Sequence, residues 1–132
     1  MLTEKDYCDY ETCVALREVG CRIQTEWYIH QPSYERGSCY LCFGIPRETS
    51  VLDECDYIPR LSLYEAQKWL REEHNLHLEI TYSPSCWTGK IYDLKEWDYI
   101  KGFTFFESFE DTLHTLIKEA VKILKENETI LR

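Results

Sequence analysis

The sequence predicts a single α+β domain over residues 1–132, with a mainly antiparallel sheet of four to five strands and about three helices. Apolar residues recur with helical spacing in three segments and alternate with polar residues in others. The alternating segments come in pairs joined by short turns, which is typical of hairpins and therefore of antiparallel sheets with helices over one face. The predicted order is α-β-β-α-β-β-(β)-α.

The chain begins with a predicted helix over residues 10–19. Asp9 is a favourable N-cap for this helix, and Gly20 is placed to end it in a left-handed conformation. Apolar and polar side chains then alternate over residues 22–29, which predicts a half-buried strand.

A segment rich in turn-forming residues follows, and residues 39–43 are expected to form the returning strand of a first hairpin. Gly44 and Pro46 end that strand. We expect residues 47–60, which carry three acidic side chains in close succession, to form a loop.

The second half begins with a helix whose start is marked by a capping box. In this motif the Ser62 hydroxyl accepts from the Glu65 amide, and the Glu65 carboxylate reaches back to the Ser62 amide. The predicted helix spans residues 63–74, and Asn75 is a plausible left-handed stop.

Two further strands are expected over residues 76–82 and 86–92, joined by the turn Ser83-Pro84-Ser85. Gly89 marks either a bulge or a close approach of another element. Residues 93–102 have mixed character and are expected to form a connection, and residues 103–106 are a candidate short fifth strand.

The clearest helix is predicted from Phe109 to about Lys125. Its apolar residues follow one another at steps of four, three and one, which gives a wide stripe on one face. The members of the stripe are Phe109, Leu113, Leu116, Ile117, Ala120, Val121 and Leu124. This stripe is expected to pack on the sheet.

The charge of the chain disfavours nucleic acid as a partner. The 24 acidic residues outnumber the 15 basic ones, which gives a net charge of −9, and both halves of the chain are acidic. A face that binds phosphates needs clustered Lys and Arg, and the sequence has no such run. The acidic balance fits a solvated protein or one that binds a basic protein surface.

The sequence also favours a cytoplasmic location. The first nine residues are acidic and do not resemble a signal peptide, and no run of 18 apolar residues is present to cross a membrane. The number of cysteines, seven, is odd, whereas a secreted disulfide framework usually has an even number. We therefore expect a reducing compartment, the cytosol of a bacterial host, with the thiols not oxidised to disulfides.

Cys39 and Cys42 have the spacing of a zinc knuckle, and Cys55 is a further candidate ligand. However, residues 39–43 are predicted to be a strand, in which side chains three apart point to opposite faces. We therefore expect no metal and no cofactor. A zinc-binding protein or a small phage-type enzyme that uses the Cys39/Cys42 region is the alternative.

No catalytic signature appears in the sequence. A Gly-rich phosphate loop, a helix motif with two His and a nucleophile elbow are all absent, and no His stands beside a cysteine in sequence. The chain is therefore expected to have no catalytic residues and to be non-enzymatic.

Several segments of the chain resemble a small protein family encoded by phages, prophages and the genomes of gut bacteria. The resemblance lies mainly in the C-terminal half, with a weaker similarity in the first helix, and the Cys39 to Cys55 segment departs from the pattern. The segments that carry it are residues 59–74, 76–80, 91–93, 102–103 and 108–120. The family is uncharacterised, so the resemblance implies a phage-related setting but no active site.

The expected function is protein–protein interaction by a small acidic protein, in one version a phage-encoded modulator or inhibitor of a host protein with a basic surface. Two sets of residues are candidates for contacting the partner. Asp53, Glu54 and Asp56 form an acidic trio in the predicted loop, and Trp97 and Tyr99 belong to an aromatic segment. That segment is either part of the core or an interface, and the sequence leaves the oligomeric state open.

Overall fold

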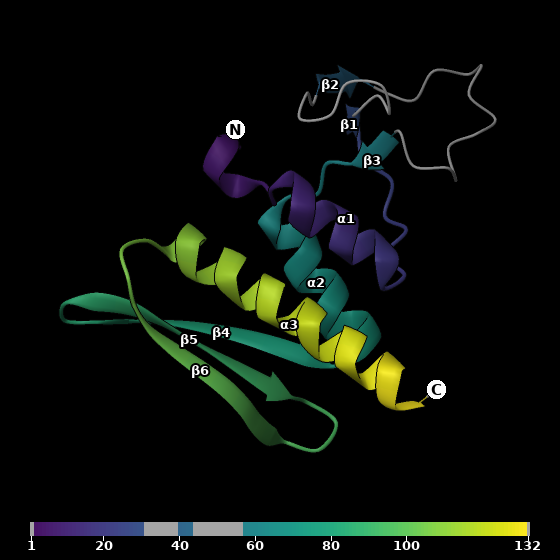
Figure 1. Ribbon diagram of the computed structural model, residues 1–132. Coiled ribbons are helices and arrows are strands. Elements are labelled where there is room, and N and C mark those ends of the chain that lie inside the picture. Colours follow the sequence, from purple (N-terminus) through teal and green to yellow (C-terminus); the bar gives the residue numbers. More distant parts are fainter. Residues whose placement is uncertain (1, 31–39, 44–56, 132) are drawn as a thin grey trace. The chain divides into compact units, whose positions relative to one another are not determined.

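The computed structural model describes residues 2–30, 40–43 and 57–131 (Figure 1). The α+β class, the three helices and the antiparallel pairing are confirmed. Contacts divide the chain into two compact units, one comprising residues 9–61 and the other residues 1–8 with residues 62–132. The organisation as a single domain stays a prediction. The strands form two three-stranded antiparallel sheets instead of one sheet of four to five.

The unit of residues 9–61 contains one helix and the first sheet, whose strand order is β2-β1-β3. The elements are α1 (Tyr10–Glu18), β1 (Trp27–His30), β2 (Tyr40–Phe43) and β3 (Tyr57–Pro59). Asp9 caps α1 as expected, because its side chain accepts a hydrogen bond of 2.8 Å from the Thr12 amide. Gly20 follows the helix with a φ of 103°, which favours glycine.

Two predictions for this unit need correction. The strand expected over residues 22–29 begins only at Trp27. The Arg22 guanidinium donates to the backbone oxygen of Arg17 at 2.6 Å, which ties this segment to the end of α1 instead of to a neighbouring strand. The predicted loop 47–60 ends in β3, which pairs with β1; the remainder of that loop up to residue 56 lies outside the described residues.

The second unit is a three-stranded antiparallel sheet with two helices side by side on one face (Figure 1). Its elements are the short helix η1 (Glu4–Asp6), α2 (Leu63–His74), β4 (Leu76–Ser83), β5 (Cys86–Asp93), β6 (Asp98–Phe106) and α3 (Phe109–Leu131). The strand order is β4-β5-β6, so β6 is an edge strand of this sheet.

Local signals set the limits of α2 as the sequence predicts. The Ser62 hydroxyl accepts from the Glu65 amide at 3.1 Å, and the Glu65 carboxylate accepts from the Ser62 amide at 3.0 Å. Asn75 ends the helix with a φ of 57°, in the left-handed region that asparagine tolerates. Both ends of α2 are therefore defined by hydrogen bonds within four residues of the chain.

The Tyr64 hydroxyl joins α2 to the N-terminal segment by donating to Asp6 at 2.6 Å. The Thr3 amide also donates to Asp6, at 2.8 Å. The Thr3 and Tyr64 donors hold the pKa of Asp6 below its usual value. The hydrogen bond to the Asp6 carboxylate raises the pKa of Tyr64 to about 12.

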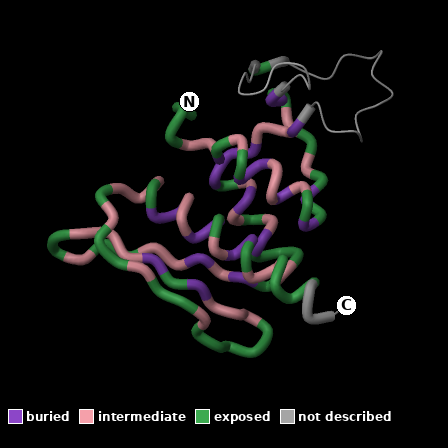
Figure 2. The backbone as a smooth tube through the Cα atoms, in the orientation of Figure 1, coloured by how far each residue is buried: buried purple, intermediate pink, exposed green. Residues whose placement is uncertain are grey.

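The core of this unit lies where α2 and α3 meet the sheet, and the buried residues gather there (Figure 2). The stripe of α3 is buried at Leu113, Leu116, Ile117, Ala120 and Val121, which confirms the predicted packing. Gly89 of β5 lies where α3 approaches the sheet closely, and a register shift between Trp87 and Gly89 adjoins it, so both of the features that the sequence left open occur there. A Cβ there would meet Leu116 Cδ1 at 2.8 Å and Thr112 Cγ2 at 2.9 Å.

Two elements of this unit are longer than expected. Helix α3 continues to Leu131, beyond the predicted end near Lys125. The connection predicted over residues 93–102 is wrong for its second half, because β6 begins at Asp98 and includes the short strand expected at 103–106. Strand β6 escaped the sequence pattern because two shifts in its pairing with β5 break the alternation of side chains.

Candidate functional site

The hairpin between β5 and β6 presents aromatic side chains at its turn. Asp93 orders the turn, because its carboxylate accepts from the amides of Lys95 at 2.9 Å and Glu96 at 3.4 Å. Trp97 closes the turn with a φ of 59°, in the left-handed region. Its side chain is 85% exposed.

Tyr99 lies next to this turn on β6. Its ring meets that of Tyr92 edge to face, with 5.8 Å between the centroids. Its hydroxyl lies over Gly102, where a Cβ would collide with it. Tyr99 is nevertheless 58% exposed, and the carboxylates of Glu96 and Asp98 beside it are exposed as well. We call Glu96, Trp97, Asp98 and Tyr99 the hairpin surface.

The backbone conformation of Trp97 is unfavourable, and its ring is almost unburied in the free chain. A non-glycine residue in the left-handed region costs about 1 kcal/mol, and a bulky one is an outlier there. Burial of an indole ring normally offsets such a cost, but this ring stays in water. Strained residues of this kind concentrate at functional sites, so Trp97 identifies the hairpin surface as a candidate site.

The edge strand β6 is irregular at two points. Tyr99 and Lys101 face consecutive residues of β5, which leaves Ile100 as an extra residue, and a second shift lies between Phe103 and Phe106. Bulges in an edge strand oppose the addition of another strand. A partner at this edge would therefore contact the side chains of β6 more readily than add a strand through backbone hydrogen bonds.

Phe105 lies at the second irregularity. Its φ is 70° and its ring is 84% exposed, so it combines backbone strain and exposure in the same way as Trp97. Sequence reasoning did not single out Phe105 or the pocket beside it. The sequence signal for this region is the density of aromatic residues from Trp97 to Phe106.

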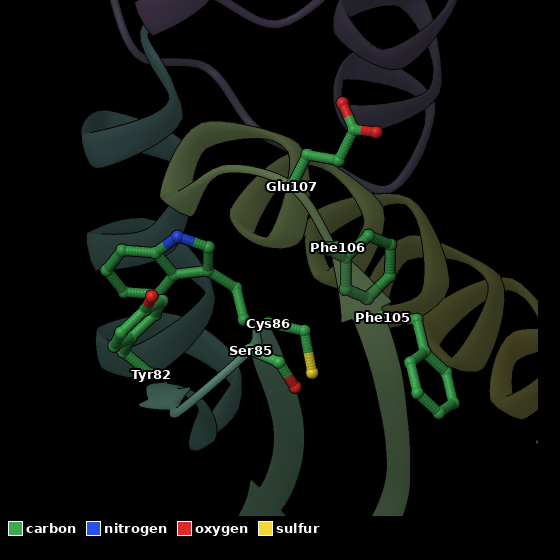
Figure 3. Close-up of a pocket in the computed structure, with 7 residues that line it drawn as sticks. Tyr82, Ser85, Cys86, Phe105, Phe106 and Glu107 are labelled. Atoms are coloured by element: carbon green, nitrogen blue, oxygen red, sulfur yellow. The ribbon is translucent and has the colours of Figure 1, made fainter.

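A shallow pocket of about 390 Å³ lies at the other end of the sheet, where the β4–β5 turn meets the end of β6. We call it the Cys86 pocket. It is lined by Tyr82, Ser85, Cys86, Trp87, Phe105, Phe106 and Glu107. Figure 3 shows the Cys86 sulfur between Tyr82 on one side and the rings of Phe105 and Phe106 on the other.

Cys86 differs from Cys8, Cys13 and Cys21 in its exposure. Those three cysteines are buried, whereas Cys86 is half-buried and lines the pocket. The Ser83 hydroxyl lies 3.4 Å from its sulfur. Hydrogen bonds from Ser83, then from the Phe105 backbone and the Ser85 hydroxyl, lower the pKa of the Cys86 thiol below its usual value.

The structure places two of the five predicted partner-binding residues. Trp97 and Tyr99 lie together on the hairpin surface. Asp53, Glu54 and Asp56 lie outside the described residues.

The zinc alternative is not tested by the structure. Cys39 and Cys55 lie outside the described residues, and Cys42 lies on β2. Within the described ranges, no three His, Cys, Asp or Glu side chains gather closely enough to hold a metal ion. Zinc binding by the Cys39/Cys42 region stays a hypothesis.

No protein-family model, curated protein or solved structure matches the chain. In the described part of the chain, no helix combines the length and the apolar character that crossing a membrane requires.

Proposed function

We propose that this protein is a non-enzymatic binding protein whose hairpin surface contacts another protein. The observation that carries the proposal is Trp97, which is strained and 85% exposed at once. The indole ring gains little burial in the free chain, and a contact with a partner would bury it.

The composition of the hairpin surface supports the same proposal. Trp and Tyr are the residue types most enriched among interface side chains that carry large binding energies. Trp97 and Tyr99 are two positions apart, at and beside an ordered turn that limits the entropy lost on binding. Rigid exposed aromatic anchors of this kind suit protein recognition.

The neighbouring charges indicate the chemistry of the partner. Glu96 and Asp98 are exposed and are sequence neighbours of the two aromatic residues, and the chain as a whole carries a net charge of −9. A partner with a basic surface would be attracted over distances of about 10 Å at 0.1 M salt. The acidic trio Asp53, Glu54 and Asp56 belongs to the same proposal as a second acidic contact.

The setting of this interaction is proposed from the sequence. The resemblance to a phage- and prophage-encoded family supports a role in the cytoplasm of a bacterial host, as a modulator or inhibitor of a host protein. The acidic balance supports a protein partner and disfavours direct binding to nucleic acid.

The proposal is tested by affinity capture from bacterial lysate with the parent and with the double variant Trp97→Ala/Tyr99→Ala. The captured partner is then titrated against both proteins. We expect the double variant to bind at least tenfold more weakly, because loss of a central aromatic anchor typically costs more than about 1.4 kcal/mol.

The matched control is Lys68→Ala/Glu72→Ala, which removes an exposed ion pair from α2 and leaves the net charge unchanged. It should bind like the parent, because exposed pairs contribute little to stability and this one lies off the hairpin surface. Equal affinities for the parent and for the Trp97→Ala/Tyr99→Ala variant would show that the hairpin surface is not the contact region.

A further inference from the structure

We propose that the Cys86 pocket binds a cationic side chain, that of a Lys or Arg residue of the partner protein. This inference rests on the proposed function, because it names a group on the partner that the hairpin surface contacts. The two sites lie at opposite ends of the sheet. Asp93 pairs with Asp98 next to the hairpin turn, whereas Trp87 pairs with Phe106 at the pocket.

The size and position of the pocket fit one side chain of a larger molecule. Its volume of about 390 Å³ is near the lower end of the range for ligand sites, and it is shallow. It is formed by the ends of β4, β5 and β6, which are regular elements of the sheet. A side chain projecting from a flat protein surface would therefore enter it without a rearrangement of the backbone.

Aromatic rings supply the first element of cation recognition. Tyr82 and Trp87 stand with their centroids 4.9 Å apart and their planes tilted by 56°. Phe109 holds the Trp87 ring from another side in an edge-to-face contact at 5.8 Å. Tyr82 is 60% exposed, so its ring is open to a ligand. The faces of such rings attract ammonium and guanidinium groups, and Trp is the best of them.

Charge supplies the second element. Glu107 lines the pocket at its rim and is exposed. Figure 3 shows its carboxylate above the rings and directed away from them, so it contributes a negative charge at the entrance of the pocket. None of the seven lining residues is basic. An anionic group is repelled by this lining, and a neutral apolar group gains nothing from Glu107.

The test uses small probes and requires no partner protein. ¹H–¹⁵N spectra of the full chain are titrated with N-acetyl-lysine methylamide and N-acetyl-arginine methylamide. N-acetyl-norleucine methylamide serves as the neutral match for lysine. We expect saturable shifts at the amides of Trp87, Phe106 and Glu107 with the two cationic probes, and much smaller shifts with the norleucine probe.

Two variants of the pocket and one matched control test the assignment. Tyr82→Leu and Glu107→Gln should each weaken binding of the cationic probes roughly three- to tenfold, the range for one cation–π or charge contact. The matched change Glu73→Gln removes an exposed carboxylate from α2 and should leave it unchanged. All three positions are exposed, so the variants are expected to fold.

Four results would overturn the inference. These are an absence of shifts, shifts centred outside the pocket, equal binding of the norleucine probe, and unchanged affinity in both Tyr82→Leu and Glu107→Gln. A fifth result would also overturn the inference. If choline binds more tightly than the lysine and arginine probes, the pocket is a site for a small free cation. The proposed function fails separately, through capture experiments with the hairpin variants.

Discussion

Trp97 exposes a large apolar ring to water. Its backbone is in a left-handed conformation that only glycine, asparagine and aspartate adopt at low cost. Trp97 and Tyr99 could be selected from their residue types, but the sequence left open whether their segment is core or interface. Trp97 is exposed at the β5–β6 turn, and the position of that turn depends on the pairing of β6 with β5 and not on neighbouring residues alone. Phe105 was missed for a related reason, because the irregular pairing near Phe105 interrupts the alternation of inward and outward side chains along β6.

Replacement of Trp97 by Asn separates stability from binding. Asn tolerates the left-handed region, so Trp97→Asn should leave the free energy of unfolding unchanged or raise it by up to about 1 kcal/mol. Binding to the captured partner should fall at least tenfold. Chemical denaturation and a binding titration on the same preparation measure both effects. A clear loss of stability would mean that the indole supports the fold after all.

The lowered pKa of Cys86 predicts a distinct pH dependence of its alkylation. The thiolate is the reactive form, so modification of Cys86 by iodoacetamide should reach half its maximal rate at a lower pH than an ordinary cysteine does. Ser83→Ala removes the hydrogen bond that lowers this pKa most and should move the midpoint upward. Mass spectrometry of timed samples gives the rate at each pH. A midpoint that does not change in Ser83→Ala would rule out this hydroxyl as the cause.

Helices were predicted better than strands because their signals are local. The capping box at Ser62 and the stop at Asn75 lie within the hydrogen-bonding reach of the helix itself, and α2 has the predicted limits. Strands depend on distant partners. Residues 22–25 show the alternation of a strand, yet Arg22 bonds to the end of α1 instead. Strand β3 is only three residues long and is defined by its pairing with β1.

The packing of α3 on the sheet is tested by charge placed on its two faces. Leu116 is fully buried, so Leu116→Asp should lower the free energy of unfolding by several kcal/mol, because an unpaired charge is buried. Asn127→Asp introduces the same residue on an exposed position of α3 and should cost less than about 1 kcal/mol. Thermal melts compare the two. Similar melting temperatures would show that α3 does not cover the core.

Gly89 gives a second test at the same contact. A larger side chain there would meet Leu116 and Thr112, both fully buried, so Gly89→Val should cost about 1–3 kcal/mol through overpacking. The double variant Gly89→Val/Leu116→Ala provides space for the valine side chain and should recover part of the lost free energy of unfolding. Denaturation of the two variants measures this recovery. No recovery in the double variant would place the strain elsewhere.

At the scale of the whole molecule, the net charge of −9 predicts that the rate of association with a basic partner decreases with added salt. Glu96→Gln/Asp98→Asn removes two exposed charges from the hairpin surface and should lower the association rate at low ionic strength. It should also flatten the decrease of that rate with added salt. Stopped-flow or surface-based kinetics at two salt concentrations measure both quantities. Equal salt dependence for variant and parent would show that these carboxylates do not guide the partner.

The central claim is that a partner protein contacts the hairpin surface. The most direct measurement replaces Trp97 with the photo-cross-linking residue p-benzoylphenylalanine and irradiates the protein in living cells, with the same replacement at Lys68 on α2 as the control. The account predicts one dominant cross-linked protein from position 97, joined through a basic region of its surface, and no such product from position 68. Cross-links at position 68 but not at position 97, or the same products from both, would contradict it.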